Sequence, residues 1–136
     1  MISTRGRYAL RVMIDIAENS NGNFVRLDEV AKRQDISEKY LESILVILTR
    51  GKMLKGVRGK GGGYKLINSP EKYKIMDILT LTEGSLAPVA CLKNDAKKCE
   101  RESFCKTLPL WKGLYGVISD YLNSITLSDL LSNLKK

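Results

Sequence analysis

Residues 36–64, ISEKYLESILVILTRGKMLKGVRGKGGGY, decide the fold of this chain. Ser37 is a suitable N-cap, and the apolar residues after it recur at helical spacings, so we expect a helix with one buried face. The apolar positions are Tyr40, Leu41, Ile44, Leu45 and Leu48. The opposite face presents Glu38, Lys39, Glu42 and Ser43 to solvent. The helix is expected to end at Thr49-Arg50-Gly51, where its pattern stops.

A glycine-rich segment follows this helix. The apolar runs 53–54 and 64–67 flank VRGKGGG at 57–63, a pattern that predicts two strands joined by a glycine hairpin with cations at its tip. No acidic residue lies between Glu42 and Glu71, whereas the interval contains the cations Arg50, Lys52, Lys55, Arg58, Lys60 and Lys65. A helix with a polar face followed by a basic hairpin suits the grooves of double-stranded DNA.

The residues before the hairpin complete a known arrangement. Apolar periodicity predicts a helix over about 4–18, and a second over 27–33 whose early acids suit the helix dipole. Asp35-Ile36 forms the turn into the helix after Ser37. Two helices joined by a tight turn, with a hairpin after them, constitute a winged helix-turn-helix. The expected fold class is therefore mainly α with a small antiparallel β wing, plus a long C-terminal dimerisation helix.

Composition limits the class of protein. The chain has 136 residues, which is one domain by length or one domain with a small appendage. Its net charge of +8 favours nucleic acid or an anionic membrane surface as partner. A basic soluble surface is the simpler interpretation of that charge. The longest apolar run, 44–48, is too short to cross a bilayer, and the N-terminus lacks the uninterrupted apolar segment of a secretion signal. We therefore expect a cytoplasmic protein that neither spans nor binds a membrane.

The segment 85–106, SLAPVACLKNDAKKCERESFCK, is a predicted loop that contains all three cysteines of the chain, Cys91, Cys99 and Cys105. An odd number of cysteines argues against a disulfide framework and for a metal site or reactive thiols. Because lysines and an arginine surround the thiols, we expect the thiols to be exposed to solvent and their thiolate forms to be stabilised by the neighbouring positive charges. The chain has no histidine, so histidine-dependent catalysis is excluded, and no constellation of residues indicates an enzyme.

After a core helix over about 75–82, the C-terminal part is expected to contain a long helix and a short one. Thr107 and Pro109 begin the long helix, whose apolar stripe consists of Leu110, Leu114, Val117, Ile118, Tyr121, Leu122 and Ile125. The stripe could pack on the chain's own domain, but we expect it to form a dimer, because a palindromic DNA site needs a two-fold protein.

Thr126 and Asp129 form a capping box for the last helix. The expected parts are thus 1–84 (DNA-binding domain), 85–106 (cysteine loop) and 107–136 (dimerisation and terminal helices).

Four stretches together resemble one protein family: ISTRGRYAL at 2–10, ISEKYLE at 36–42, VRGKGGGY at 57–64 and the three-cysteine loop. They are similar to the bacterial winged-helix regulators typified by the iron–sulfur regulator IscR, the nitric oxide sensor NsrR and the cysteine-metabolism repressor CymR. The resemblance implies a homodimeric transcriptional regulator that binds a palindromic operator. In cluster-bearing members it also implies an iron–sulfur cluster, [2Fe–2S] in preference to [4Fe–4S], held by Cys91, Cys99 and Cys105.

The resemblance also assigns DNA contacts. Glu42 corresponds to a position implicated in choosing between types of DNA site, and Arg58 and 61–63 lie on a wing that enters the minor groove, where an arginine suits the enhanced negative potential. Arg5 and Arg7 resemble residues near DNA phosphates. The expected DNA-binding set is Arg5, Arg7, Ser37, Glu38, Lys39, Tyr40, Glu42, Arg50, Arg58, Lys60 and Gly61.

The fourth ligand of such a cluster departs from the family pattern. Seven residues separate Cys91 from Cys99 and five separate Cys99 from Cys105, so the first gap is longer than in IscR. The region where IscR has a histidine is Lys106-Thr107-Leu108 here, and the position that resembles the NsrR aspartate is Tyr8. The remaining donors are Asp95, Glu100, Glu102, an exogenous thiol or water. An incomplete protein shell would make the cluster labile, which suits a sensor.

Two other functions remain open from the sequence. The ending SITLSDLL at 124–131 resembles CymR, which implies a cluster-free repressor controlled by its thiols or by a partner enzyme of cysteine synthesis. A small iron–sulfur electron carrier or scaffold is the alternative from another class. We rank an iron–sulfur cluster ahead of bare redox thiols, and both ahead of zinc, which prefers four good ligands.

Overall fold

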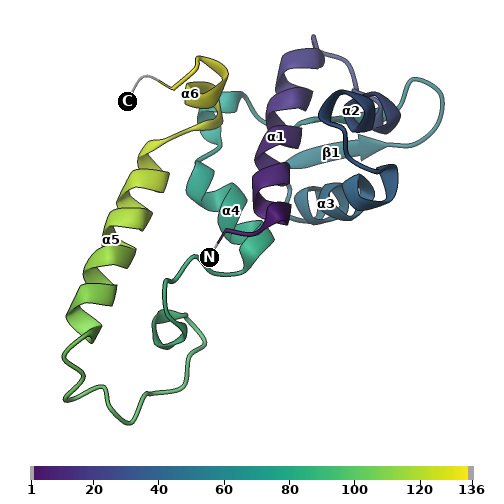
Figure 1. Cartoon of the computed structure of the whole chain (residues 1–136). Coiled ribbons are helices and arrows are strands. Elements are labelled where there is room, and N and C mark those ends of the chain that lie inside the picture. The colour runs from purple at the N-terminus through teal and green to yellow at the C-terminus, as the bar shows by residue number, and fades with distance from the viewer. Residues whose placement is uncertain (1, 135–136) are drawn as a thin grey trace.

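The computed structural model describes residues 2–134 and shows a helical protein with one small sheet (Figure 1). The elements follow the order α1 (Thr4–Asn19), α2 (Leu27–Gln34), α3 (Glu38–Arg50), β1 (Leu54–Val57), β2 (Gly63–Leu66), η1 (Pro70–Lys72), α4 (Ile75–Glu83), η2 (Ala90–Leu92), α5 (Leu108–Ser124) and α6 (Leu127–Leu131). This architecture confirms the winged-helix fold class. None of the described helices is both long and apolar enough to span a membrane.

Helices α2 and α3 form the expected helix-turn-helix. Asp35 adopts the left-handed conformation (φ 54°) at the end of α2, and its backbone N–H donates to the carbonyl of Ala31. The side chain of Ser37 then accepts a hydrogen bond from the Tyr40 N–H, which confirms the predicted N-cap of α3. The turn is short because the αL residue reverses the chain at once, so α3 is held across α2.

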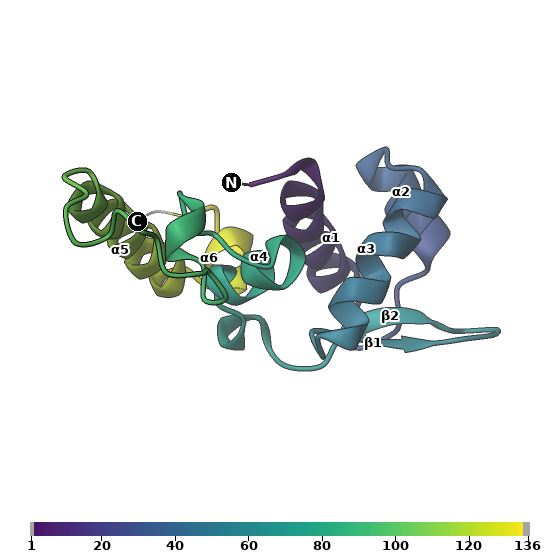
Figure 2. The ribbon, with the colours of Figure 1, turned by 90° about the horizontal axis from the view of Figure 1, so that it is seen from below.

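The wing is a two-stranded antiparallel sheet in which Leu54 pairs with Leu66 and Val57 with Gly63. Gly59 and Gly61 at its tip have positive φ values of 94° and 78°, a conformation in which side chains are strained. Tyr64 also pairs with Val25, the extended residue between α1 and α2, through two backbone hydrogen bonds of 2.8 Å. The second strand of the wing is thereby attached to the segment between α1 and α2, while the hairpin tip projects away from the helices (Figure 2).

A buried tyrosine secures the other side of the wing. The hydroxyl of Tyr73, a residue only 3% exposed, donates to the Met53 carbonyl at 2.8 Å. It also accepts from the N–H groups of Ile67 and Asn68, at 3.0 and 2.9 Å. One hydroxyl therefore satisfies three backbone groups where the chain enters and leaves the hairpin.

The core is one cluster to which α1, α3, α4 and the start of α6 contribute. Ile125 belongs to it at 2% exposure, and its carbonyl accepts from the Ile75 N–H at 2.9 Å. Ile125 therefore departs from the expected dimerisation stripe, because the chain turns at the end of α5 and tucks this side chain inward. The Thr126–Asp129 capping box of α6 is present as expected. The outermost residues of the first and third predicted parts, 1 and 135–136, lie outside the described residues.

Helix α5 and the wing lie at opposite ends of the molecule in both views (Figures 1 and 2). No residue of α5 is buried. The loop from Gly84 to Thr107 connects α4 to the far end of α5 and contains one 3₁₀ turn, η2. In sequence, this loop lies between the winged helix-turn-helix and the long, exposed helix α5.

Candidate nucleic-acid interface and cysteine loop

The outer face of α3 is free to meet a partner. Leu41, Ile44, Leu45 and Leu48 are fully buried on the inner face. The residues exposed on the outer face are Glu38, Lys39, Glu42, Ser43, Val46 and Arg50. Tyr40 is half-buried, and its ring packs edge-to-face on Tyr8 of α1 at 5.9 Å between centroids. The predicted α3 residues therefore share one surface, with Tyr40 at its margin.

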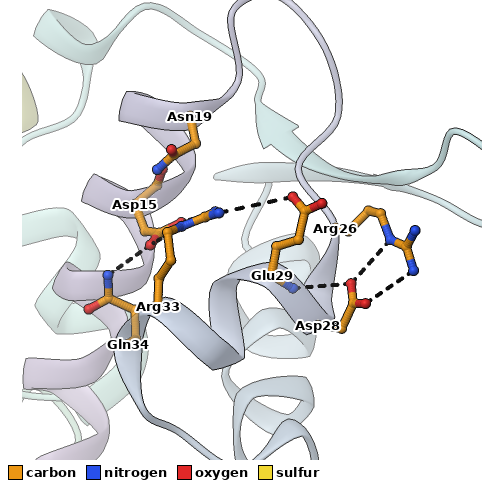
Figure 3. A network of polar contacts seen from close by, with 7 residues as sticks. All are labelled: Asp15, Asn19, Arg26, Asp28, Glu29, Arg33 and Gln34. Carbon is orange, nitrogen blue, oxygen red and sulfur yellow. Dashed lines mark hydrogen bonds and ion pairs between the residues drawn. The ribbon is translucent and has the colours of Figure 1, made fainter.

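A polar network holds α2, the first helix of the helix-turn-helix, against α1 (Figure 3). Asp15, only 2% exposed, accepts two hydrogen bonds from Arg33 Nε, at 3.0 and 3.2 Å, and one from Arg33 Nη2 at 2.8 Å. Gln34 donates a further hydrogen bond to Asp15 at 2.8 Å. The hydrogen bonds to Asp15 raise the pKa of Arg33 above its ordinary value. The buried carboxylate is thus fully paired.

The wing presents its cations as expected. Arg58, Lys60 and Gly61 are exposed at or near the hairpin tip. Gly63 must remain a glycine, because a Cβ there would lie 2.3 Å from the Val25 carbonyl oxygen. The close backbone pairing that attaches the wing therefore depends on this residue, while the tip is left to contact a ligand.

The two arginines of the N-terminal segment are exposed on α1 but on different sides of it. Arg5 lines a surface hollow together with Tyr40 of α3, so it extends the α3 surface. Arg7 lies two residues further along the helix, and its Nη2 donates to Thr4 Oγ1 at 3.3 Å. The structure therefore brings Arg5, but not Arg7, next to Tyr40, a predicted DNA-binding residue of α3.

A cavity of about 250 Å³ lies between the cysteine loop and the start of α5. All three cysteines line it, together with Glu102 and the cations Lys93, Lys97, Lys98 and Lys112. Asp95 and Glu100, the other predicted carboxylate donors, do not line it. Within residues 2–134, no three Cys, Asp, Glu or His side chains are close enough to hold one metal ion. The cysteines therefore share a cavity without converging on a single point.

One of the three thiols has a distinct environment. Cys105 Sγ lies 3.4 Å from the Thr107 hydroxyl. Hydrogen bonding from that hydroxyl, and from the backbone N–H groups of Thr107 and Leu108, lowers the pKa of Cys105 below its ordinary value. The potential metal donors of the cavity lining are thus three thiols and one carboxylate. Thiolates are the usual ligands of iron–sulfur clusters, whereas structural zinc prefers four good ligands.

The outer face of α5 is apolar. Leu110, Leu114, Val117 and Tyr121 are 61%, 40%, 67% and 50% exposed, at spacings of four, three and four residues. Ile118 and Leu122 are half-buried beside them. Six of the seven predicted stripe residues thus lie along α5 itself, and Ile125 is in the core.

Sequence reasoning missed two features of this surface. Val46 was not expected on the outer face of α3, although its position seven residues after Lys39 is the signal that places it there. The bridge between Val25 and Tyr64 was also missed, because pairing between distant single residues leaves no local pattern.

Comparison with known proteins agrees with this geometry. The family model Rrf2, described as an iron-dependent transcriptional regulator, matches residues 2–133. The HTH-type transcriptional regulator IscR of Sodalis glossinidius is 35% identical over 132 residues, which are 97% of this chain and 79% of that protein.

Two solved structures are similar throughout. CymR, the global cysteine regulator of B. subtilis, has a TM-score of 0.78 and 34% identity, over 98% of this chain and 97% of that one. IscR of T. potens has a TM-score of 0.77 and 32% identity, over 99% and 88%. A family match that spans nearly every residue, on a winged helix with an exposed basic wing, shows that the chain belongs to the Rrf2 family of DNA-binding transcriptional regulators.

Proposed function

We propose that the chain is a homodimeric regulator whose two winged heads bind a palindromic operator, and whose cysteine loop binds an iron–sulfur cluster. The observation that carries the cluster proposal is that Cys91, Cys99 and Cys105 all line one cavity. When bound, the cluster supplies chemistry that oxidants or nitric oxide can alter, and this would make DNA binding sensitive to them. The four lysines of the lining would offset the negative charge of the thiolates.

Glu102 is our candidate for the fourth protein ligand. It is the acidic residue of the cavity lining, whereas Asp95 and Glu100 lie outside that lining. A carboxylate is a harder donor than a thiolate, so it would hold iron less firmly and leave one corner of the cluster exchangeable. Within the described residues no three of these donors converge on a single point, so we expect the loop to rearrange when a cluster binds.

The proposed dimer rests on the exposed apolar face of α5. An exposed stripe of leucine, valine and tyrosine over three turns is costly in water, and a second copy of the same helix would bury it. A two-fold pair of heads then matches a palindromic site. Because the cysteine loop runs directly into α5, ordering of the loop would change the relative orientation of the two winged-helix domains in the dimer.

The cluster is tested by anaerobic purification from cells competent in cluster assembly, followed by a visible spectrum and iron and sulfide analysis. We expect visible absorption and iron in the wild type, and neither in the triple variant Cys91→Ala, Cys99→Ala, Cys105→Ala. Glu102→Gln should lose iron faster on exposure to a chelator. Glu100→Gln, which changes a carboxylate outside the cavity lining, serves as the matched control. A colourless, iron-free wild type would reject the cluster.

DNA binding by the wing is tested with salt. A regulator that neutralises six to ten phosphates should lose about 10³-fold or more in affinity between about 50 mM and about 200 mM salt, while still preferring one sequence. Arg58→Ala should weaken binding and reduce the salt dependence, because Arg58 is exposed at the wing. An electron carrier without a genomic target would show neither sequence preference nor this response to Arg58.

A second candidate function is favoured by Cys105. The lowered pKa of this thiol increases its thiolate fraction, which suits direct control by oxidation without a cluster. The structural similarity to CymR, a global cysteine regulator, supports the same candidate. Here the wild type would be iron-free and its DNA affinity would still depend on redox state. Equal affinity of the wild type and the triple cysteine variant under all redox conditions would instead favour control by a partner enzyme of cysteine synthesis.

A further inference from the structure

A shallow groove of about 340 Å³ separates the second half of α3 from the wing. Val46 and Arg50 of α3 form one wall, and Val57 and Arg58 of the β1 side of the wing form the other. Each wall therefore combines one valine with one arginine. Both arginines are exposed, and the valines are 44% and 43% exposed.

Val46 lies on the exposed outer face of α3. Counting from Lys39, the exposed outer positions Glu42, Ser43, Val46 and Arg50 follow at three, four, seven and eleven residues, which is one face of a helix. Every other member of that series is polar or charged. A single exposed valine is ordinary on a protein surface, but this one lies in the middle of the face that DNA would meet.

The groups that DNA offers to such a residue are few. In the major groove the base edges carry hydrogen-bond donors and acceptors, and the apolar group among them is the C5-methyl of thymine. A strand that enters the groove from the face of α3 would place its phosphates near Arg50 and Arg58. The arginines would then position the backbone, and the valine side chain would be left for a base edge.

We propose that Val46 is a specificity-determining residue that contacts a thymine methyl group in each half of the operator. This inference rests on the proposed reading of DNA by α3. Val46 would make van der Waals contact with the methyl and exclude water from it, and would discriminate thymine from cytosine or uracil at that position. Arg50 and Arg58, by contrast, would bind any sequence.

The test removes only the methyl group. An operator is first selected by the full-length protein from a randomised duplex pool, and each thymine is then replaced singly by deoxyuridine, which keeps base pairing and the O4 acceptor. We expect one position in each half-site at which this replacement weakens wild-type binding about fourfold, the effect of one buried methyl. For Val46→Ala, thymine and deoxyuridine at that position should bind equally.

Two variants serve as controls. Ile67→Ala removes an apolar side chain that is 49% exposed but lies outside the groove, and it should retain the wild-type preference for thymine. Arg50→Ala should weaken binding to all sequences and reduce the salt dependence while retaining that preference. Val46→Ala improves helix propensity, so its melting temperature should be no lower than that of the wild type.

The possible outcomes distinguish failure of the Val46 inference from failure of the proposed operator binding. If every deoxyuridine position is neutral, or if Val46→Ala keeps the wild-type preference, the inference is overturned while sequence-specific binding stands. If selection yields no preferred sequence at all, the proposed operator binding fails and the inference fails with it.

Discussion

Glu83 accepts two hydrogen bonds from Ser3, one from its hydroxyl at 2.7 Å and one from its backbone N–H at 3.2 Å. Ser3 is the N-cap of α1, and Glu83 is the last residue of α4. Gly84, in a positive-φ conformation (78°), follows Glu83 and leads into the cysteine loop. One carboxylate thus joins the start of the loop to the helix end that presents Arg5, and its charge also suits the positive end of the α1 dipole.

Replacing Glu83 by glutamine should weaken this connection without changing its shape. We expect the free energy of unfolding to fall by about 1 kcal/mol, because a charge-assisted hydrogen bond is exchanged for a neutral one. We also expect the difference in DNA affinity between iron-loaded and iron-free protein to shrink, measured by fluorescence anisotropy on the selected operator. Glu18→Gln, at the opposite end of α1, should leave both quantities unchanged. An unaltered affinity difference in Glu83→Gln would show that this contact does not transmit the state of the loop.

The Asp15–Arg33 pair should contribute more to stability than the Arg26–Asp28 pair drawn beside it in Figure 3. Arg33→Ala would leave the carboxylate of Asp15, 2% exposed, without its main partner, and should lower the free energy of unfolding by about 2 to 3 kcal/mol. Arg26→Ala breaks a pair whose side chains are 67% and 50% exposed, and should cost less than about 1 kcal/mol. Urea denaturation of the two variants gives the comparison, and equal losses would contradict it.

The reactivity of Cys105 should depend on the Thr107 hydroxyl. Because hydrogen bonding from Thr107 lowers the pKa of Cys105, its thiolate fraction at a given pH exceeds that of an ordinary cysteine, so alkylation should begin at lower pH. Thr107→Val removes the donor, and the pH midpoint of alkylation should move upward. The change should not weaken α5, since the Thr107 side chain makes no cap hydrogen bond.

Alkylation by iodoacetamide across a pH series, followed site by site with mass spectrometry on iron-free protein, measures this midpoint. Thr107→Ser keeps a hydroxyl and should restore the wild-type value. If Thr107→Val and Thr107→Ser gave the same midpoint as the wild type, the hydroxyl would have no part in activating the thiol.

Much of the fold was predictable because its signals are local. The Ser37 cap, the buried face of α3 and the Thr126–Asp129 capping box each depend on residues within one or two helical turns, and the structure confirms them. Ile125 shows where such reasoning stops. Its spacing continues the stripe of α5, but its burial is decided by a backbone pairing with Ile75, fifty residues earlier in the chain.

The candidate sites divide in the same way. The exposed cations of the wing follow from a hairpin that its glycines and charges already indicate. The choice of Glu102 over Glu100 does not follow from sequence, because it depends on which carboxylate the irregular loop turns toward the cavity. Tyr73 was likewise missed, since a hydroxyl that bonds three backbone groups of the hairpin leaves no periodic pattern.

The apolar face of α5 gives a prediction about assembly. Val117 is 67% exposed in the middle of the stripe, so Val117→Glu should not disturb the fold of one chain. In a dimer formed by two α5 helices, however, each glutamate would be buried against the partner's apolar face, and an unpaired buried charge is strongly destabilising. We therefore expect the wild type to be dimeric and Val117→Glu to be monomeric by light scattering at micromolar concentration, with unchanged secondary structure.

Asn123→Glu is the matched control for this variant, because it adds the same charge on the opposite, polar side of α5 and should remain dimeric. Binding to DNA gives a second readout. A monomeric Val117→Glu should lose most of its affinity for the full palindrome but bind an isolated half-site as the wild-type head does, since α3 and the wing are unaltered. If Val117→Glu stays dimeric, or if it loses half-site binding as well, the two heads are not joined through this face and the stripe must be covered in another way.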